Sequence, residues 1–155
     1  MVTPQTIVCT AAVVRHADRI LLVRQAPGHR LQGQWTVPWG RLEAGESPAA
    51  AALRETQEEG GVRAEVEGLL GVQELPAPWK GWFALVYLCR HLEGECQPDG
   101  HETDAARYVR ACELAELAEP IEPWSAWLIG RIFAGQFHAL CRSSTSPFGG
   151  VDAFL

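Results

Sequence analysis

The sequence predicts an α/β fold in which a mixed β-sheet is sandwiched between helices. Three observations lead to this prediction: β-branched, apolar stretches before residue 40, a strong helix-forming segment at 48–59, and further strand-like and helical stretches up to Phe133. The 155 residues, 47% of them hydrophobic, suit one domain with its own core. We expect that domain at 5–138 and a loosely held tail, rich in Ser, Pro and Gly, at 139–155.

Two strands joined by a tight turn are expected at the start of the chain. Residues 7–14 and 19–25 are apolar and β-branched, and the polar segment 15–18 between them is typical of a hairpin turn. Residues 34–37 offer a further short strand, which leads into a loop around Gly40.

The segment after this loop is predicted to be helical at 48–59. The Ser47 hydroxyl can cap free amides, and Pro48 suits the first helical turn. The residues that follow are strong helix formers, and Gly60 and Gly61 supply a left-handed stop.

The chain beyond the helix alternates between strand-like and helical patterns. Pro76 and Pro78 break two strand candidates apart, and Pro123 suits the first turn of a late helix. The expected elements are strands at 62–74, 82–91 and 106–110 and helices at 112–118 and 122–133.

The predicted helix gathers carboxylates on one face. At about 100° per residue, Glu55, Glu58 and Glu59 share a sector beside the one that packs. These like charges repel, and one Arg54 cannot neutralise them together with Glu46 in the loop. Mg²⁺ or Mn²⁺, which prefer oxygen ligands, would offset the repulsion. The alternative is an acidic helix face that is merely solvated.

The spacing of charged residues and glycines is more specific than the charge itself. Gly40 is followed after five residues by Glu46, and seven residues later by the segment RETQEEGGV at 54–62. This pattern resembles the signature of the Nudix (MutT-like) hydrolase family at every charged and glycine position. The resemblance covers residues 5–138 and implies the α/β/α fold of that family.

Roles for the acidic residues follow from this resemblance. Glu55 and Glu59 look like the principal metal ligands, and Glu58 looks like a further ligand or the general base. Arg54 and Glu46 are similar to a pair that orients the helix glutamates.

Two further ligands are implied outside the helix. The Gly40 carbonyl is similar to a backbone ligand of the family, and Glu102 lies in the context of a loop that often supplies another carboxylate. Glu102 could equally be an ordinary surface acid, and we expect the neighbouring His101 to be solvated.

Substrate contacts are expected from aromatic and basic residues in loops. Trp39 stands where similar proteins commonly carry a second glycine, and Thr56 replaces an aliphatic residue. A base could stack on an exposed indole, whereas Trp35 and Trp127 are expected to pack. The candidate substrate-binding residues are Trp39, Arg24, Pro78 and Trp79.

Composition excludes several other classes of protein. A net charge of −6 argues against stable binding to nucleic acid or anionic lipid through a basic surface. The chain shows no basic secretory leader and no apolar run of about 18 residues, so a cytoplasmic location is expected. Its five cysteines form no CxxC pair, which argues against a zinc site or a disulfide framework.

The sequence therefore predicts a Mg²⁺-dependent pyrophosphohydrolase that acts on a nucleoside diphosphate linked to another group, such as an ADP-ribose-like compound. One alternative is a MutT-like enzyme that removes pyrophosphate from damaged nucleoside triphosphates. A second is a non-catalytic module of the same fold that senses a nucleotide or a partner. A homodimer is possible, although no residue pattern specifies its interface.

Overall fold

The computed structural model describes residues 6–145, 147 and 149–155. Its strands form one sheet of order β3-β2-β1-β6-β5, in which β4 also pairs with β1 and β7 with β2. Strands β1 and β6 run parallel, and the other pairs are antiparallel, which confirms the mixed sheet. The strands are β1 (Val8–His16), β2 (Arg19–Gln25), β3 (Trp35–Thr36), β4 (Trp39–Arg41), β5 (Arg63–Glu74), β6 (Phe83–Glu93) and β7 (Thr103–Val109).

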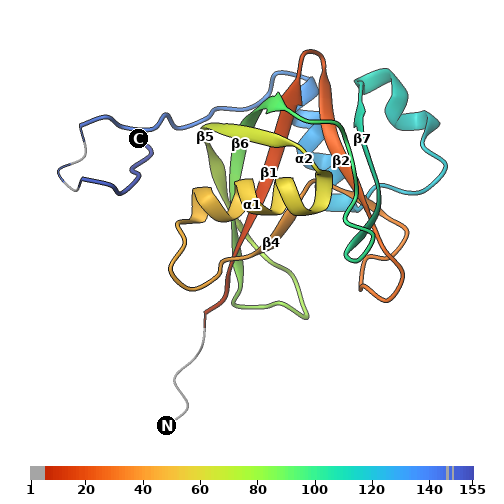
Figure 1. The fold of residues 1–155 in the computed structure, drawn as a ribbon, viewed down its shortest axis with the longest axis horizontal. Coiled ribbons are helices and arrows are strands. Elements are labelled where there is room, and N and C mark those ends of the chain that lie inside the picture. The colour runs from red at the N-terminus through yellow and green to blue at the C-terminus, as the bar shows by residue number, and fades with distance from the viewer. Residues whose placement is uncertain (1–5, 146, 148) are drawn as a thin grey trace, which may run out of the picture.

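Helices α1 (Pro48–Gly60) and α2 (Pro123–Phe133) cover opposite faces of this sheet (Figure 1). Alternate residues of β1 point to opposite faces. Ala12 therefore packs in a buried cluster with Ala52 of α1, whereas Ala11 packs in a second cluster with Ile129 of α2. The predicted α/β/α sandwich is confirmed.

The ends of α1 follow the capping residues that the sequence indicated. The Ser47 hydroxyl accepts a hydrogen bond from the Ala50 amide at 3.2 Å. Gly61 takes a left-handed conformation (φ 74°) and donates its amide to the Gln57 carbonyl. A residue with a Cβ is strained at such a φ, so the helix ends where the glycine pair predicted.

Two strands differ from the sequence prediction because sheet pairing determines their extent. β4 lies where a loop was expected, since its three residues pair with β1 and place Gly40 opposite Thr10. β7 begins at Thr103 rather than at residue 106, because it pairs with β2 as far as Gln25.

The late helices also differ in detail. The expected helix at 112–118 is a 3-10 helix, η1 (Ala111–Glu116), since the chain must soon reach Pro120, whose carbonyl accepts the Trp35 amide. The prediction that Trp127 packs is wrong: its side chain is 56% exposed. It points away from the sheet face of α2, and Arg131 lies over its ring at 5.5 Å.

The described part of the C-terminal segment runs back onto the sheet. Leu140 forms a bridge with Leu69 of the edge strand β5, and Phe154 meets Tyr87 edge to face at 5.6 Å. The expected domain boundary at residue 138 stays a prediction.

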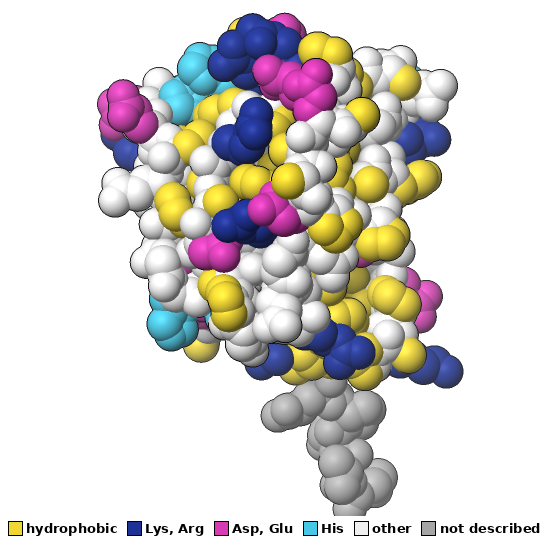
Figure 2. Space-filling view, turned by 90° about the vertical axis from the view of Figure 1, so that its right-hand side faces the viewer, with side chains coloured by type: hydrophobic (Ala, Val, Ile, Leu, Met, Phe, Trp, Pro, Cys, Tyr) yellow, Lys and Arg dark blue, Asp and Glu magenta, His cyan; other side chains and the backbone are white. Residues whose placement is uncertain are grey.

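Acidic side chains accompany basic ones on the side of the molecule that carries β7 and η1. Figure 2 shows dark blue Lys and Arg next to magenta Asp and Glu there. Two of the ion pairs are Arg24 with Asp104 at 2.7 Å and Arg110 with Asp18 at 2.8 Å. Within residues 6–145, 147 and 149–155, no helix is long and apolar enough to cross a membrane.

Candidate active site

The Glu55 carboxylate lies directly over Gly40 of β4. A Cβ added to Gly40 would stand 1.9 Å from Glu55 Oε1, so only glycine leaves room for this carboxylate. Burial raises the pKa of Glu55 to about 7, although the adjacent Arg54 guanidinium opposes the shift. Glu55 therefore exchanges protons near neutral pH in the metal-free protein.

Glu59, one turn further along α1, is more deeply buried. Glu59 is 2% exposed, and its Oε2 accepts a hydrogen bond from the Trp39 amide at 2.9 Å. Burial raises the pKa of Glu59 well above the usual range, and the Glu55 charge raises it further. Trp39 thus contributes a backbone donor, a role that its side chain did not indicate.

Glu102 reaches the same place from the loop that precedes β7. Asp99 shapes this loop, because its Oδ1 accepts the amides of His101, Glu102 and Thr103 at 2.8–3.0 Å. The Thr103 hydroxyl in turn donates to the Glu59 carbonyl at 2.8 Å, which fastens the loop to α1. The sequence did not single out Asp99, although Asp99-Gly100 is a turn signature.

These three carboxylates form a compact group of oxygen donors. One oxygen each from Glu55, Glu59 and Glu102 lies within 4.8 Å of the others. Two of the three residues are buried, so their repulsion is poorly screened by water. Hard divalent cations such as Mg²⁺ take carboxylate oxygens of this kind, and the space kept open over Gly40 fits that use.

Arg54 joins Glu46, Glu55 and Glu58, and every N–H group of its guanidinium donates a hydrogen bond. Its Nε and Nη2 donate to both oxygens of Glu46, and Nη1 donates to Glu55 and Glu58 at 2.9 Å. The remaining Nη2 donor goes to the Arg41 carbonyl. These five bonds use all five N–H groups of a guanidinium, so none is left for Glu59 or Glu102.

The pairing with Arg54 also separates the roles of its partners. The hydrogen bond from Arg54 lowers the pKa of Glu46, which keeps Glu46 charged as the brace of the loop. Glu58 has a half-exposed side chain and lies outside the group of three carboxylates, but it lines the same cavity.

The carboxylates open into a cavity of about 680 Å³ whose rim carries arginine side chains. The Arg30 guanidinium lies 4.7 Å from the centre of the Trp79 ring, and Arg41 lies 4.7 Å from that of Trp82. Such stacking holds a guanidinium in place while its N–H groups stay available to anions. The cavity thus combines acidic ligands for a metal with cations suited to phosphate.

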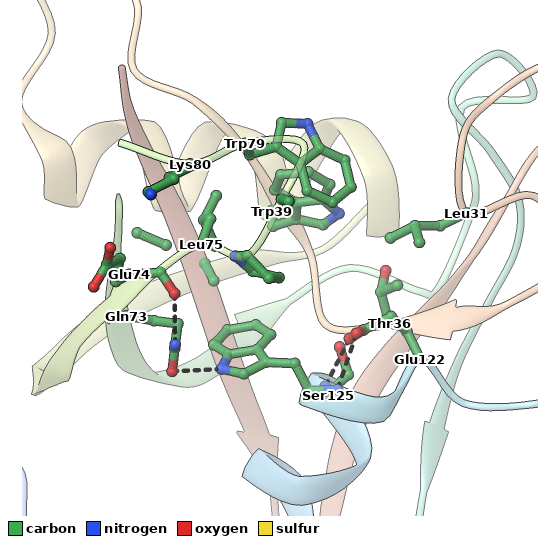
Figure 3. Close-up of a pocket in the computed structure, with 15 residues that line it drawn as sticks. Leu31, Thr36, Trp39, Gln73, Glu74, Leu75, Trp79, Lys80, Glu122 and Ser125 are labelled. Carbon is green, nitrogen blue, oxygen red and sulfur yellow. Dashed lines mark hydrogen bonds between the residues drawn. The ribbon is translucent and has the colours of Figure 1, made fainter. Parts of the chain in front are cut away.

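A second, largely apolar cavity of about 570 Å³ adjoins the first. Leu31, Trp39 and Trp79 line both of them. Figure 3 shows Trp39 and Trp79 close together at one end of the second cavity, where their rings meet edge to face at 6.4 Å, and Thr36, Glu122 and Ser125 at another. An aromatic group bound here would lie next to the carboxylates.

The other candidate residues lie further from these walls. Arg24 pairs with Asp104 and Glu119 and lies over the Trp35 ring, outside the walls of both cavities. Pro78 is not part of either wall as the described residues form it, although the neighbouring Trp79 is part of both.

The arrangement of helix, glycine-bounded loop and carboxylates matches a known family. The model of the NUDIX domain matches residues 5–128 of this chain. This chain belongs to the NUDIX domain family. The resemblance inferred from the spacing of Gly40, Glu46 and the α1 glutamates is thereby confirmed.

Several NUDIX relatives are similar over most of the chain. A MutT-like protein of Streptomyces ambofaciens is 35% identical over 67% of this chain and 63% of its own length. An 8-oxo-dGDP phosphatase of Homo sapiens is 34% identical over 66% of this chain but 32% of its own length. The chain therefore spans less than two thirds of both relatives. A NUDIX hydrolase structure from Nitrosomonas europaea superposes with a TM-score of 0.74 at 22% identity, covering 88% of this chain and 75% of that one. This similarity shows a common fold.

Proposed function

We propose that this NUDIX protein is a Mg²⁺-dependent pyrophosphohydrolase that cleaves the diphosphate of a nucleoside diphosphate derivative. The observation that supports this most directly is the convergence of Glu55, Glu59 and Glu102 within 4.8 Å, in a cavity with arginines on its rim and an aromatic-lined cavity beside it. The three carboxylates would hold Mg²⁺, or Mn²⁺, with the Gly40 carbonyl as a further ligand.

The reaction adds water across one phosphoric anhydride bond. The water oxygen bonds to phosphorus, the bond from phosphorus to the bridging oxygen breaks, and the second phosphate leaves with that oxygen. A divalent metal, when bound, neutralises charge on the phosphate oxygens. Glu58 is the residue we assign as the base that takes the proton from water, since it faces the cavity but lies outside the three-carboxylate group.

The two cavities suggest how such a substrate is held. A nucleobase fits the apolar cavity against Trp39 and Trp79, which places the diphosphate by the carboxylates and near Arg30. Arg41 and Trp82 line the same cavity as the glutamates, and we assign this part of it to the group beyond the diphosphate. This assignment favours a nucleoside diphosphate derivative over a triphosphate.

The main alternative is a MutT-like nucleoside triphosphate pyrophosphohydrolase, which the name of the Streptomyces ambofaciens relative supports, whereas the human relative is named for a nucleoside diphosphate, 8-oxo-dGDP. The two reactions differ in product: a nucleoside diphosphate derivative yields a nucleoside monophosphate and the phosphorylated partner group, whereas a triphosphate yields pyrophosphate. A non-catalytic sensor is disfavoured, because a sensor has no need for Arg54 to brace Glu58 beside an open cavity.

The deciding experiment is a parallel assay of ADP-ribose, dinucleotides and nucleoside triphosphates, each with Mg²⁺ and with EDTA. Metal-dependent release of AMP from ADP-ribose or a dinucleotide is the expected result, with products identified by chromatography. Pyrophosphate release from triphosphates alone would establish the MutT-like alternative. Nucleotide binding without turnover of any compound would indicate the sensor. A cytoplasmic location, a homodimer and the lack of stable nucleic-acid binding stay predictions.

A further inference from the structure

The hydroxyl of Thr10 is a polar group buried inside the protein. Thr10 is 0% exposed, and among the described residues its Oγ1 has no hydrogen-bond partner. A buried hydroxyl without a partner destabilises a protein. Since valine has nearly the same shape and lacks this defect, the hydroxyl at this position calls for a role.

The position of Thr10 on β1 places its side chain beside the carboxylate of Glu55. In the extended strand Thr10 has the same parity as Ala12, which packs under α1. Thr10 also lies directly opposite Gly40 in the antiparallel pairing of β1 with β4, and opposite residues project from the same face, with Cβ atoms about 5 Å apart. Glu55 Oε1 lies 1.9 Å from the point where the Gly40 Cβ would be. The Glu55 carboxylate therefore lies where a side chain at position 40 would lie, next to Thr10.

The Glu55 carboxylate has capacity for the bond that Thr10 lacks. Among the described residues, Glu55 receives its hydrogen bond from Arg54 Nη1, on Oε1, so Oε2 can accept another. Threonine has alternative staggered χ1 positions, and rotation about χ1 redirects the hydroxyl without moving the strand. An unpaired donor thus lies next to an acceptor with a free lone pair.

We propose that Thr10 is a positioning residue, whose hydroxyl donates a hydrogen bond to the Glu55 carboxylate and holds it in the orientation that binds a divalent metal. This role rests on the proposed function of the glutamate cluster. A second donor is useful there because Arg54 Nη1 donates to both Glu55 and Glu58 and reaches only one oxygen of Glu55. Thr10 approaches Glu55 from the sheet instead.

The test compares Thr10→Val and Thr10→Ser with the wild-type protein in three measurements: the melting temperature without metal, the dissociation constant of Mn²⁺ by electron paramagnetic resonance, and kcat and KM. We expect Thr10→Val to melt at the same or a higher temperature without metal, because the hydroxyl that it removes has no partner among the described residues of the metal-free protein and is used only when Glu55 takes its metal-binding orientation. Its Mn²⁺ dissociation constant should rise about tenfold, as for other residues that orient metal ligands, and kcat should fall while KM changes little. Thr10→Ser should stay within about twofold of wild type, since it keeps the hydroxyl that orients the ligand.

A matched control is Thr56→Val on α1. Thr56 is also fully buried, but its hydroxyl already donates to the Ala52 carbonyl at 2.8 Å, so the same exchange should leave Mn²⁺ affinity unchanged. If valine fits poorly at position 10, the Mn²⁺ affinities of Thr10→Ala and Thr10→Ser are compared instead. Both variants lack the methyl group, so they differ only in the hydroxyl.

Two results would overturn the role of Thr10. One is wild-type Mn²⁺ affinity in Thr10→Val, whatever its melting temperature. The other is equal loss of affinity in the serine and alanine variants. If the wild-type protein itself bound no Mn²⁺, the metal site and the proposed function would fail together, an outcome distinct from both.

Discussion

Replacing Glu55 by glutamine should stabilise the metal-free protein at alkaline pH. Glutamine has the shape of a protonated glutamate and can still accept the hydrogen bond of Arg54 at Oε1. The wild-type carboxylate must ionise in a buried place next to other acids, whereas the amide carries no charge. A catalytic site of this kind is expected to cost stability.

The magnitude and sign follow from the pKa of Glu55. Burial raises it from 4.5 to about 7, and each unit is worth about 1.36 kcal/mol, so the ionised carboxylate destabilises the fold by about 3 kcal/mol at most. Between these two pKa values the native state binds more protons than the unfolded chain, so stability falls as pH rises through this window. Glutamine removes that dependence. The gain should therefore be near zero at pH 4.5 and reach its full size above pH 7.

Urea unfolding in EDTA at pH 4.5 and pH 8 measures this difference. With a slope of about 2 kcal/mol/M, the midpoint of Glu55→Gln should lie above wild type at pH 8 by up to about 1.5 M. Adding Mg²⁺ should reverse the order, since only the wild type gains binding energy. Glu93→Gln, at an exposed carboxylate paired with Arg63, is the control and should shift little at either pH. A Glu55→Gln variant less stable than wild type at pH 8, or equally shifted at both pH values, would refute the reasoning.

Three further predictions concern catalysis. Glu59→Gln should nearly abolish turnover and remove the Mg²⁺-induced rise in melting temperature while the fold is retained, and wild-type activity in this variant would contradict the role of Glu59 as a ligand. Glu58→Gln should lower kcat by about 10² to 10⁴ but keep the Mg²⁺-induced rise. Asp99→Ala removes the acceptor of three loop amides, so Mg²⁺ affinity through Glu102 should fall about tenfold or more, while Asp99→Asn, measured by the same titration, should lose less. Trp39→Gly keeps the backbone donor to Glu59 but deletes the ring, so KM should rise about tenfold with kcat nearly unchanged; unchanged kinetics across the nucleotide panel would mean that the indole only packs.

The parts of the site that the sequence predicted are those set by local geometry. Helical periodicity alone places Glu55, Glu58 and Glu59 on one face, and the residues around Ser47 and Gly61 define the ends of that helix without reference to the sheet. Their contacts with Arg54 also follow from short separations along the chain. These contacts could be predicted because the α1 carboxylates and Arg54 lie within one turn or one loop of each other, whereas the roles assigned to them stay predictions.

The parts that were missed depend on pairing between distant segments. Gly40 lies opposite Thr10 because β4 pairs with β1, and no local pattern in either segment predicts this register. Likewise, the Trp39 amide reaches Glu59 only because this strand passes under α1. Trp127 shows the opposite error: a large apolar residue was expected to pack, but the helix face that meets the sheet was already filled by Leu128 and Ile129.

The charge arrangement explains why the proposed site would need a cation from outside the chain. Arg54 donates its five hydrogen bonds to Glu46, Glu55, Glu58 and one carbonyl, so it donates none to Glu59 or Glu102. Glu59 is left with a backbone amide, and Glu102 is held in place by a loop rather than by a positive charge. Since burial makes it costly to ionise Glu55 and Glu59 so close together, the pKa of each carboxyl is raised, and in the proposed function both exchange their protons for a divalent ion. In the proposed function, the same feature that lowers stability above neutral pH thus also favours binding of the metal.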